Sequence, residues 1–393
     1  TLTLRGQKVV NGGLMQGSNA LSLDTLTLDN LAGGTLYSAR NLTLEIPGLT
    51  NGGLIATDGD LRLAGATLSN AGELNGVNLS ADYAILDNHV TGRLLADNAL
   101  DLAADTLTSD GLLAAKNTTL VAGALTNRGQ IQGDDGLIVT AADAANAGSL
   151  LTHGTLALHG NTLHNTGLAS AARLGLGYQQ IVNRGTLQGS DTLTATGDTL
   201  FNRQGGLLLS NGLLTLDNQR LRNAGQLQGE TLNLATGEWI NGGTVLAEKD
   251  LEATVGGALD NEGRIVSQQA LALQAERLSN RGALLAKVLD FQGDLSNSGL
   301  VQGSDRLGLK TRNLLNAPTG KVFSGSGLEL APDRLDNQGQ FQVEGQLTLT
   351  GTTLVNGGTL DAQTLDIDLS GALDNQGVLL ADNATRLRSA TLT

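Results

Sequence analysis

A short polar corner recurs along this chain and restricts the folds that it can adopt. Asparagine is followed two places later by glycine at 15 positions, and Ser109 with Gly111 adds one corner of the same spacing. The 15 asparagines are Asn11, Asn51, Asn70, Asn127, Asn146, Asn165, Asn183, Asn223, Asn241, Asn261, Asn280, Asn297, Asn337, Asn356 and Asn375. Four wide corners have the glycine four places on: Asn30 with Gly34, Asn88 with Gly92, Asn202 with Gly206, and Asn316 with Gly320. Together these give 20 anchors at a mean spacing near 19 residues.

Apolar residues keep a fixed place relative to the anchors. Leucine stands two residues before the anchor at 16 of 20 positions. The exceptions are Val9, Ala144, Ile181 and Trp239, and we assign Trp239 to the core for this reason. Alternating leucines also recur nine and seven residues before many anchors, and such short alternation is typical of strands rather than helices. Equal side chains that return once per turn stack directly, as between parallel strands about 4.8 Å apart. The sequence predicts an all-β fold, a single parallel β-helix (solenoid) of about 20 rungs.

The corner residues fit such a coil. Asparagine side chains bond to backbone groups two residues on and suit turns, and stacked asparagine amides can pair between neighbouring strands. Glycine at the next position permits either a positive φ or a close approach of two backbones.

Composition limits the functional classes. The net charge of -14 argues against nucleic acid or another polyanion as the main partner. The absence of cysteine excludes a disulfide framework and thiolate chemistry. There is no signal-peptide pattern at Thr1 and no apolar run near 18 residues. We expect one domain over residues 1–393, cut from a longer filament.

The repeat Asn-x-Gly-x-Leu…Leu-x-Leu-x-Ala…Leu-x-Asn, with runs such as Leu295–Gly303, resembles the haemagglutinin repeats of filamentous haemagglutinin and its relatives. This family includes the contact-dependent growth inhibition effectors, which are large exoproteins. The resemblance implies a right-handed coil, located outside a Gram-negative cell and exported by two-partner secretion through an outer-membrane transporter. The family's Asn-Pro-Asn-Gly-Ile-type secretion motif and a C-terminal toxin-like domain are absent from this sequence.

The sequence offers only weak candidates for metal-binding or catalytic residues. His153, His159 and His164 lie within one turn, but their positions face outward on different sides, so we expect no metal site. Asp58 with Asp60 and Asp134 with Asp135 lack the tandem Gly-Gly-x-Gly-x-Asp pattern of calcium-binding solenoids. Carboxylates that precede anchors never fall on consecutive turns: Asp29, Asp87, Asp260, Asp336 and Asp374. We therefore predict no enzyme activity, no cofactor and no metal.

The four wide corners are candidate contact loops, because loops on a rigid scaffold often carry recognition. Tyr37, Tyr83 and Tyr178 are candidate exposed aromatic residues for the same role. Plain tolerance of insertions is the competing interpretation of the corners.

We interpret the chain as a structural and adhesive filament segment that extends a distal receptor-binding or toxin-bearing region from the cell. One alternative is that the segment itself binds a receptor or glycan, and a third is a β-helical polysaccharide-degrading enzyme. Expected partners are the secretion transporter during export and a receptor on a target or host cell, with the shaft monomeric and without nucleic acid.

Overall fold

The computed structural model describes residues 2–393, which form strands and no helix. The chain forms two compact units, residues 1–196 and 197–393, and ten of the 20 anchors fall in each. Within residues 2–393 no helical segment is long and apolar enough to cross a bilayer.

The strands that begin in the first unit are β1 (Leu2–Arg5), β2 (Lys8–Asn11), β3 (Leu14–Gly17), β4 (Leu21–Asp24), β5 (Thr27–Asn30), β6 (Thr35–Ser38), β7 (Leu42–Glu45), β8 (Gly48–Asn51), β9 (Leu54–Thr57), β10 (Leu61–Asn70), β11 (Glu73–Asn88), β12 (Arg93–Ser109), β13 (Leu112–Asn127), β14 (Gln130–Asn146), β15 (Ser149–Leu151), β16 (Thr155–Asn165), β17 (Leu168–Asn183) and β18 (Thr186–Asn202).

The strands of the second unit are β19 (Leu207–Ser210), β20 (Leu213–Asn223), β21 (Gln226–Gly229), β22 (Thr231–Asn241), β23 (Thr244–Ala247), β24 (Leu251–Val255), β25 (Ala258–Asn261), β26 (Arg264–Ser267), β27 (Ala270–Asn280), β28 (Ala283–Asn297), β29 (Leu300–Lys310), β30 (Asn313–Asn316), β31 (Lys321–Ser324), β32 (Leu328–Leu330), β33 (Arg334–Asn337), β34 (Gln340–Gly351), β35 (Thr353–Asn356), β36 (Thr359–Leu369), β37 (Ala372–Asn375), β38 (Val378–Arg388) and β39 (Thr391–Leu392).

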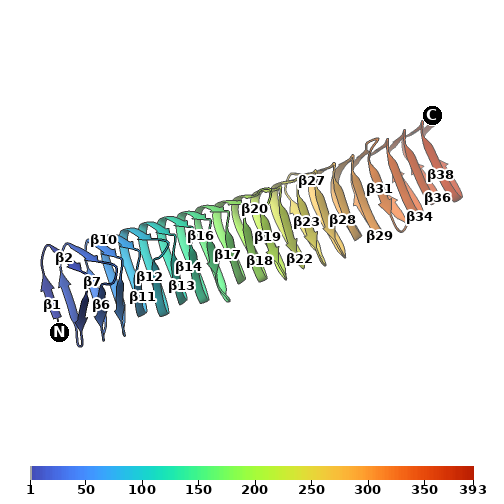
Figure 1. Ribbon diagram of the computed structural model, residues 1–393. Coiled ribbons are helices and arrows are strands. Elements are labelled where there is room, and N and C mark those ends of the chain that lie inside the picture. Colours follow the sequence, from blue (N-terminus) through green and yellow to red (C-terminus); the bar gives the residue numbers. More distant parts are fainter. Residues whose placement is uncertain (1) are drawn as a thin grey trace. The chain divides into compact units, whose positions relative to one another are not determined.

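Strands in each unit pair in parallel with strands one turn away, so successive turns stack as coils (Figure 1). The register places anchor on anchor, as for Asn51 and Asn70 in the first unit and Asn261 and Asn280 in the second. Both pairs are 19 residues apart. The predicted all-β parallel solenoid with about 19 residues per turn is confirmed, whereas the right-handed sense stays a prediction.

The predicted leucine column forms the core of each unit. Leu28 and Leu278 have no exposed surface, and Trp239, which replaces a leucine of this column, is equally buried. Trp239 stacks in register on Leu221 and Leu259. The assignment of Trp239 to the core is therefore confirmed. Because burial alternates along most strands, each rung buries one face of its strands and exposes the other.

A second buried column consists of the anchor asparagines. The amide nitrogen of each anchor donates to the side-chain oxygen of the next anchor at 2.7 to 2.9 Å, from Asn11 to Asn88 and, within the second unit, from Asn202 to Asn375. Each amide therefore stabilises two rungs at once, because it links them without exposing a polar group.

Glycine follows the anchor because neighbouring backbones approach closely at that position. A β-carbon on Gly263 would collide with the carbonyl oxygen of Gly243 one turn earlier, and Gly282 stands in the same relation to Gly263. Among the described residues, positive φ occurs only at Gly33, Gly197, Gly205 and Gly293, none of which follows an anchor by two places. Of the two reasons for glycine that the sequence allows, close approach is the correct one.

Candidate functional site

The wide corners keep the regular hydrogen bonds and insert a β-turn between them. In the first wide corner the N–H of Gly34 donates to the carbonyl of Leu31 at 2.8 Å, and in the third the N–H of Gly206 donates to that of Arg203 at 2.8 Å. The third residue of each turn is glycine with a positive φ, 86° at Gly33 and 83° at Gly205. These are type II turns, in which glycine is favoured because other residues rarely adopt this φ.

The second and fourth wide corners close with the same backbone hydrogen bond, from the N–H of Gly92 to the carbonyl of His89 at 2.7 Å and from the N–H of Gly320 to that of Ala317 at 2.8 Å. Their third turn residue is threonine, whose hydroxyl donates to a carbonyl one turn earlier: Thr91 to Ala71 and Thr319 to Ser298, both at 2.7 Å. Pro318 occupies the second turn position, where its fixed φ is favoured. All four corners are thus ordered turns on the coil.

Only the middle residues of the wide corners are available for contact. The predicted residues that bound the corners are buried: Asn30, Gly34, Asn88, Gly92, Asn202, Gly206, Asn316 and Gly320. The asparagines belong to the asparagine column, and in the first three corners the asparagine amide donates to the glycine carbonyl. Val90, in contrast, is 77% exposed and Leu31 is 49% exposed. A contact role for these corners stays a prediction, carried by the three residues between each asparagine and its glycine.

The prediction of exposed aromatic residues is wrong for Tyr83 and Tyr178. Both are 1% exposed, and burial raises the pKa of each hydroxyl. Each ring occupies space left by a glycine on the preceding rung: an added β-carbon would lie 2.7 Å from the Tyr83 ring at Gly65 and 2.6 Å from the Tyr178 ring at Gly160. The signal was present in the sequence, because Leu79, Ala81 and Tyr83 alternate on one face and all point inward.

Tyr37 is partly exposed on β6, and its hydroxyl donates to Asp58 at 2.5 Å. This hydrogen bond, together with the charge of the carboxylate and some desolvation, raises the pKa of Tyr37. Tyr37 is thus held by a partner within the chain.

The third wide corner carries a cation–π cluster that the sequence analysis missed. The guanidinium groups of Arg203 and Arg222 lie 5.0 and 5.5 Å from the ring centre of Phe201. The residue paired with Arg222 on the following rung is Ile240, so that position supplies no carboxylate to Arg222. Arginine held over an aromatic ring is typical of residues that dominate protein interfaces.

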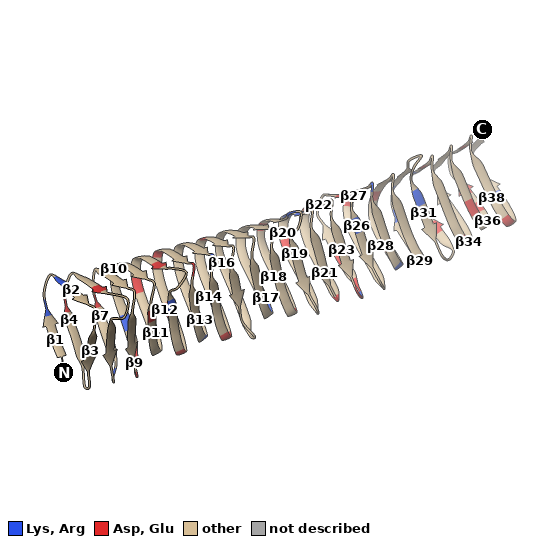
Figure 2. Ribbon diagram, in the orientation of Figure 1, with Lys and Arg blue, Asp and Glu red and all other residues tan. Residues whose placement is uncertain are grey.

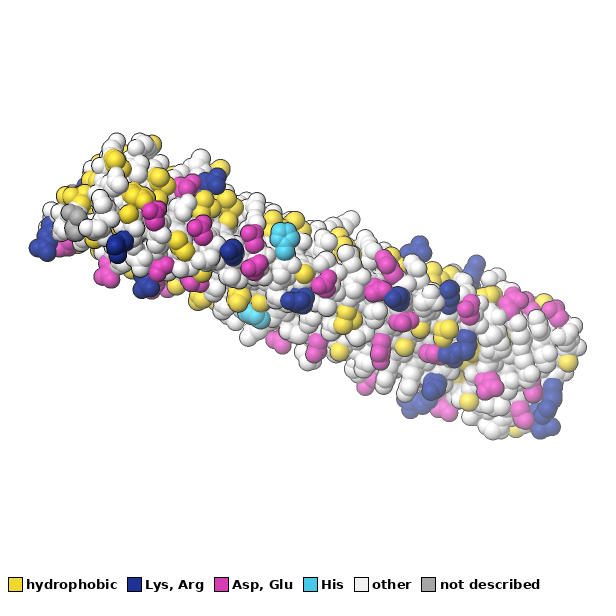
Figure 3. Space-filling model, turned by 90° about the horizontal axis from the view of Figure 1, so that it is seen from below, with side chains coloured by type: hydrophobic (Ala, Val, Ile, Leu, Met, Phe, Trp, Pro, Cys, Tyr) yellow, Lys and Arg dark blue, Asp and Glu magenta, His cyan; other side chains and the backbone are white. Residues whose placement is uncertain are grey.

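The histidines and acidic residues form no metal site in the described part of the chain. His153, His159 and His164 are all exposed, as predicted. Among residues 2–393 no three histidine, aspartate or glutamate side chains gather where they could hold a metal ion. Of the acids before anchors, Asp29 pairs with Lys8 at 2.7 Å and Asp336 with Arg334 at 2.8 Å. Figure 2 shows acidic and basic residues spread along the strands of each unit, and on the face drawn in Figure 3 their side chains are mixed.

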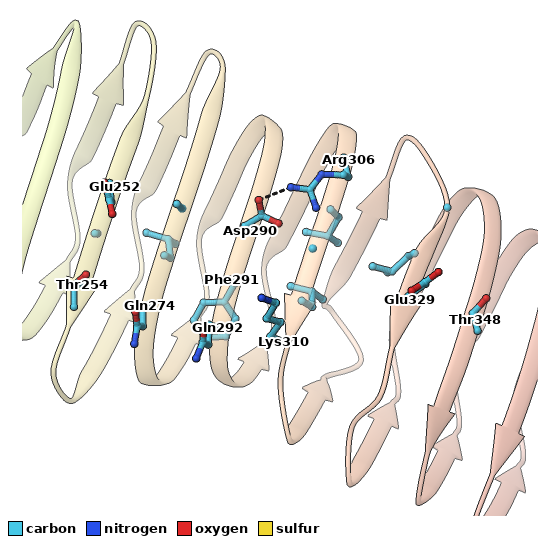
Figure 4. Close-up of a pocket in the computed structure, with 18 of the residues that line it drawn as sticks. Glu252, Thr254, Gln274, Asp290, Phe291, Gln292, Arg306, Lys310, Glu329 and Thr348 are labelled. Atoms are coloured by element: carbon cyan, nitrogen blue, oxygen red, sulfur yellow. Dashed lines mark hydrogen bonds and ion pairs between the residues drawn. The ribbon is translucent and has the colours of Figure 1, made fainter.

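A groove of about 920 Å³ in the second unit crosses β24, β27, β28, β29, β32 and β34 (Figure 4). Buried leucines and Phe291 lie beneath it. Two rows of outward side chains line it in register. One row is Glu252, Ala272, Asp290 and Gly308, and continues as Glu329 and Thr348; the other is Thr254, Gln274, Gln292 and Lys310.

Small residues and a missing strand pairing open this groove. Ala272 and Gly308 alternate with carboxylates in the first row, and a β-carbon on Gly308 would collide with Asp290. Asp290 forms an ion pair with Arg306. β29 pairs with β28 and β32 pairs with β34, but within the described residues β29 and β32 do not pair with each other. No sequence motif marks this groove.

The fold and its two internal columns define a parallel β-solenoid repeat protein. The family model for the haemagglutinin repeat matches residues 168–238, 229–302 and 289–377. The chain is 33% identical to "Toxin CdiA" of Escherichia coli over 95% of its length, which is 13% of that relative. It is 30% identical to "Deoxyribonuclease CdiA" of Dickeya dadantii and 34% identical to "16S rRNA endonuclease CdiA" of Enterobacter cloacae, in each case over 98% of this chain and 14% of the relative. No solved structure matches it.

The chain therefore belongs to the haemagglutinin-repeat family, within the contact-dependent growth inhibition exoproteins. These are secreted, cell-surface proteins of Gram-negative bacteria. The chain spans about one seventh of the curated relatives that it matches. It is a repeat segment of such an exoprotein.

Proposed function

We propose that this segment is a non-catalytic shaft, one continuous domain over residues 1–393 of a longer filament, that extends a distal receptor-binding or toxin-bearing region from the cell. The observation that carries the proposal is the unbroken pair of internal columns in the second unit. From Asn202 to Asn375 every rung is joined to the next by an asparagine amide and by a buried apolar stack. Such nearest-neighbour contacts let a solenoid grow along one axis without a larger core.

Export by an outer-membrane two-partner secretion transporter and a cell-surface receptor for the parent protein belong to the same proposal. The family supports the transporter. This segment covers only 13 to 14% of each relative. That small share supports the proposal that the activity named for the relatives resides outside the repeat segment. The mixed surface charge supports a monomeric shaft that does not bind nucleic acid.

Deletion of whole rungs in the full-length parent protein tests the shaft. Removal of residues 262–280 or 338–356 joins one anchor to the next and preserves both columns, because the anchors in each pair are 19 residues apart. Both deletions are expected to retain export and surface display and to shorten the reach of the distal region by the same step. A deletion of residues 342–350 is the control, because it removes half a turn and should block folding.

The shaft proposal is contradicted if one whole-rung deletion abolishes target-cell binding while the other leaves it unchanged. That outcome would show that a particular rung makes the contact.

A second candidate function is direct contact with a receptor or glycan through the third wide corner, and the cation–π cluster at Phe201 supports it. Deletion of Arg203 and Gln204 resets this corner to the regular length. The matched control deletes Ala317 and Pro318 from the fourth wide corner. Loss of cell binding in the first variant alone would support the contact; equal binding by both would contradict it.

A further inference from the structure

The groove over β24 to β34 carries polar groups that the fold leaves unused. Within the described chain no side-chain hydrogen bond or ion pair engages Glu252, Gln274, Gln292, Lys310 or Glu329, although all five face the groove. Some surface amides outside the groove are paired, as Gln226 is with Gln228 at 2.7 Å. The groove therefore presents donors and acceptors that are free to meet a ligand.

The shape of the groove selects an extended ligand. It crosses six strands, so at about 4.8 Å per strand it is roughly 24 Å long. Its volume of about 920 Å³ lies within the usual range of ligand sites. From β24 to β29 each rung contributes one residue to each row, and β32 and β34 continue the first row, so a ligand whose unit length is close to the strand spacing would meet a lining position at every step.

The charge of the lining disfavours polyions. Three carboxylates and two cationic groups face the groove, and Asp290 and Arg306 neutralise each other. Glu252 and Glu329 repel a polyanion, whereas Lys310 repels a polycation. The remaining contacts come from amides and hydroxyls, which bind hydroxyl groups as both donors and acceptors.

We propose that this groove binds a linear, uncharged oligosaccharide that lies across the strands with about one sugar ring per rung. A pyranose ring is about as long as the strand spacing of about 4.8 Å, whereas an extended peptide advances only about 3.3 Å per residue and falls out of step with the rungs. Ala272 and Gly308 leave room for rings between the longer side chains. The site is independent of the shaft role, which stands if the groove binds nothing.

The test measures binding of maltohexaose, cellohexaose and chitohexaose to the 393-residue chain by calorimetry. Hexagalacturonate and hexalysine are the charged probes. The variant Gln274→Ala/Gln292→Ala removes two exposed amides from the groove, and Gly308→Leu fills it. The matched control is Gln226→Ala/Gln228→Ala, which removes two amides from the same unit outside the groove.

At least one neutral hexasaccharide is expected to bind, and both groove variants should weaken it tenfold or more while the control variant binds as the parent chain does. The proposal is overturned if no neutral hexasaccharide binds at millimolar concentration, or if the groove variants bind as well as the control. Binding of hexagalacturonate or hexalysine in place of the neutral sugars, lost in the same two variants, would also overturn it and assign the groove to a charged polymer.

Discussion

Replacement of Ser109 by asparagine should repair a defect in the asparagine column. Ser109 is the only anchor that is not asparagine. Asn88 donates to its hydroxyl at 3.4 Å, beyond the usual N–H···O range of about 2.7 to 3.2 Å. On the other side, the side-chain oxygen of Asn127 is buried without a partner. The hydroxyl is too short to reach both neighbours.

Asparagine should fit at this position, because the other wide corners are followed by asparagine anchors. Asn30 donates to Asn51 at 2.7 Å and Asn316 to Asn337 at 2.8 Å across the same 21-residue step. The variant Ser109→Asn shortens one hydrogen bond and supplies a donor to Asn127. An unsatisfied buried acceptor costs about 1–3 kcal/mol, and one net hydrogen bond contributes about 0.5–1.5 kcal/mol. Since these contributions overlap, we expect the variant to raise the free energy of unfolding of these rungs by about 1–2 kcal/mol.

Hydrogen exchange with mass spectrometry measures this locally. Amides of the rungs between Asn88 and Asn127 should exchange about 5 to 30 times more slowly in Ser109→Asn, which corresponds to 1–2 kcal/mol. Ser109→Asp is the matched control: it has the same shape but cannot donate to Asn127, so it should destabilise these rungs. Equal exchange in the wild type and Ser109→Asn, or faster exchange in the latter, would refute the reasoning.

Three further substitutions probe the columns and the buried rings. Leu278→Asp buries an unpaired carboxylate and should cost about 4 kcal/mol or more, with faster hydrogen exchange centred on the neighbouring rungs; unchanged exchange there would show that the side chain escapes the core. Gly263→Ala should lower the free energy of unfolding in urea by about 1–3 kcal/mol, because the added β-carbon collides with a backbone carbonyl. Its control is Gly13→Ala, whose β-carbon would meet nothing within 4 Å, and it should change the free energy of unfolding by less than about 0.5 kcal/mol. Similar losses of stability in both variants would contradict the close approach of the two backbones at Gly263. Tyr83→Phe removes a buried hydroxyl without a partner and should stabilise the first unit by about 1–2 kcal/mol in thermal unfolding; a loss of stability would show that the hydroxyl is satisfied.

The repeat made the fold predictable, because every rung repeats the same information. One leucine two places before one asparagine is a weak signal, but its recurrence near every 19 residues specifies both the register and the inward face. The same logic should have placed Tyr83 inside, since it continues the inward alternation of Leu79 and Ala81. The position of a residue along the strand, rather than its aromatic character, decides which face of the sheet its side chain takes.

The groove could not be predicted in this way, because the leucine and asparagine columns continue unbroken through its rungs. Its depth depends on Ala272 and Gly308, which are ordinary small residues in the sequence, and on the absence of pairing between β29 and β32. Leu314 and Asn316 keep both columns intact between these two strands, so the columns give no sign of the missing pairing. Similarly, the cluster at Phe201 brings together Arg203 and Arg222 from two successive rungs, and only the register shows that they meet.

The wide corners show why such a shaft can acquire new surface without losing its fold. Asn30 donates to the carbonyl of Gly34 at 3.2 Å, and Asn51 makes the same bond to Gly53 at 3.2 Å with two fewer residues between them. The asparagine and the glycine therefore close the corner whatever lies between them, and the inserted turn leaves both columns in register. Because the columns hold the rungs and the inserted residues do not, changes between anchor and glycine alter what the segment presents at little cost in stability. Sequence variation should therefore concentrate at the corners, whereas the anchors, the following glycines and the leucine column are constrained by packing.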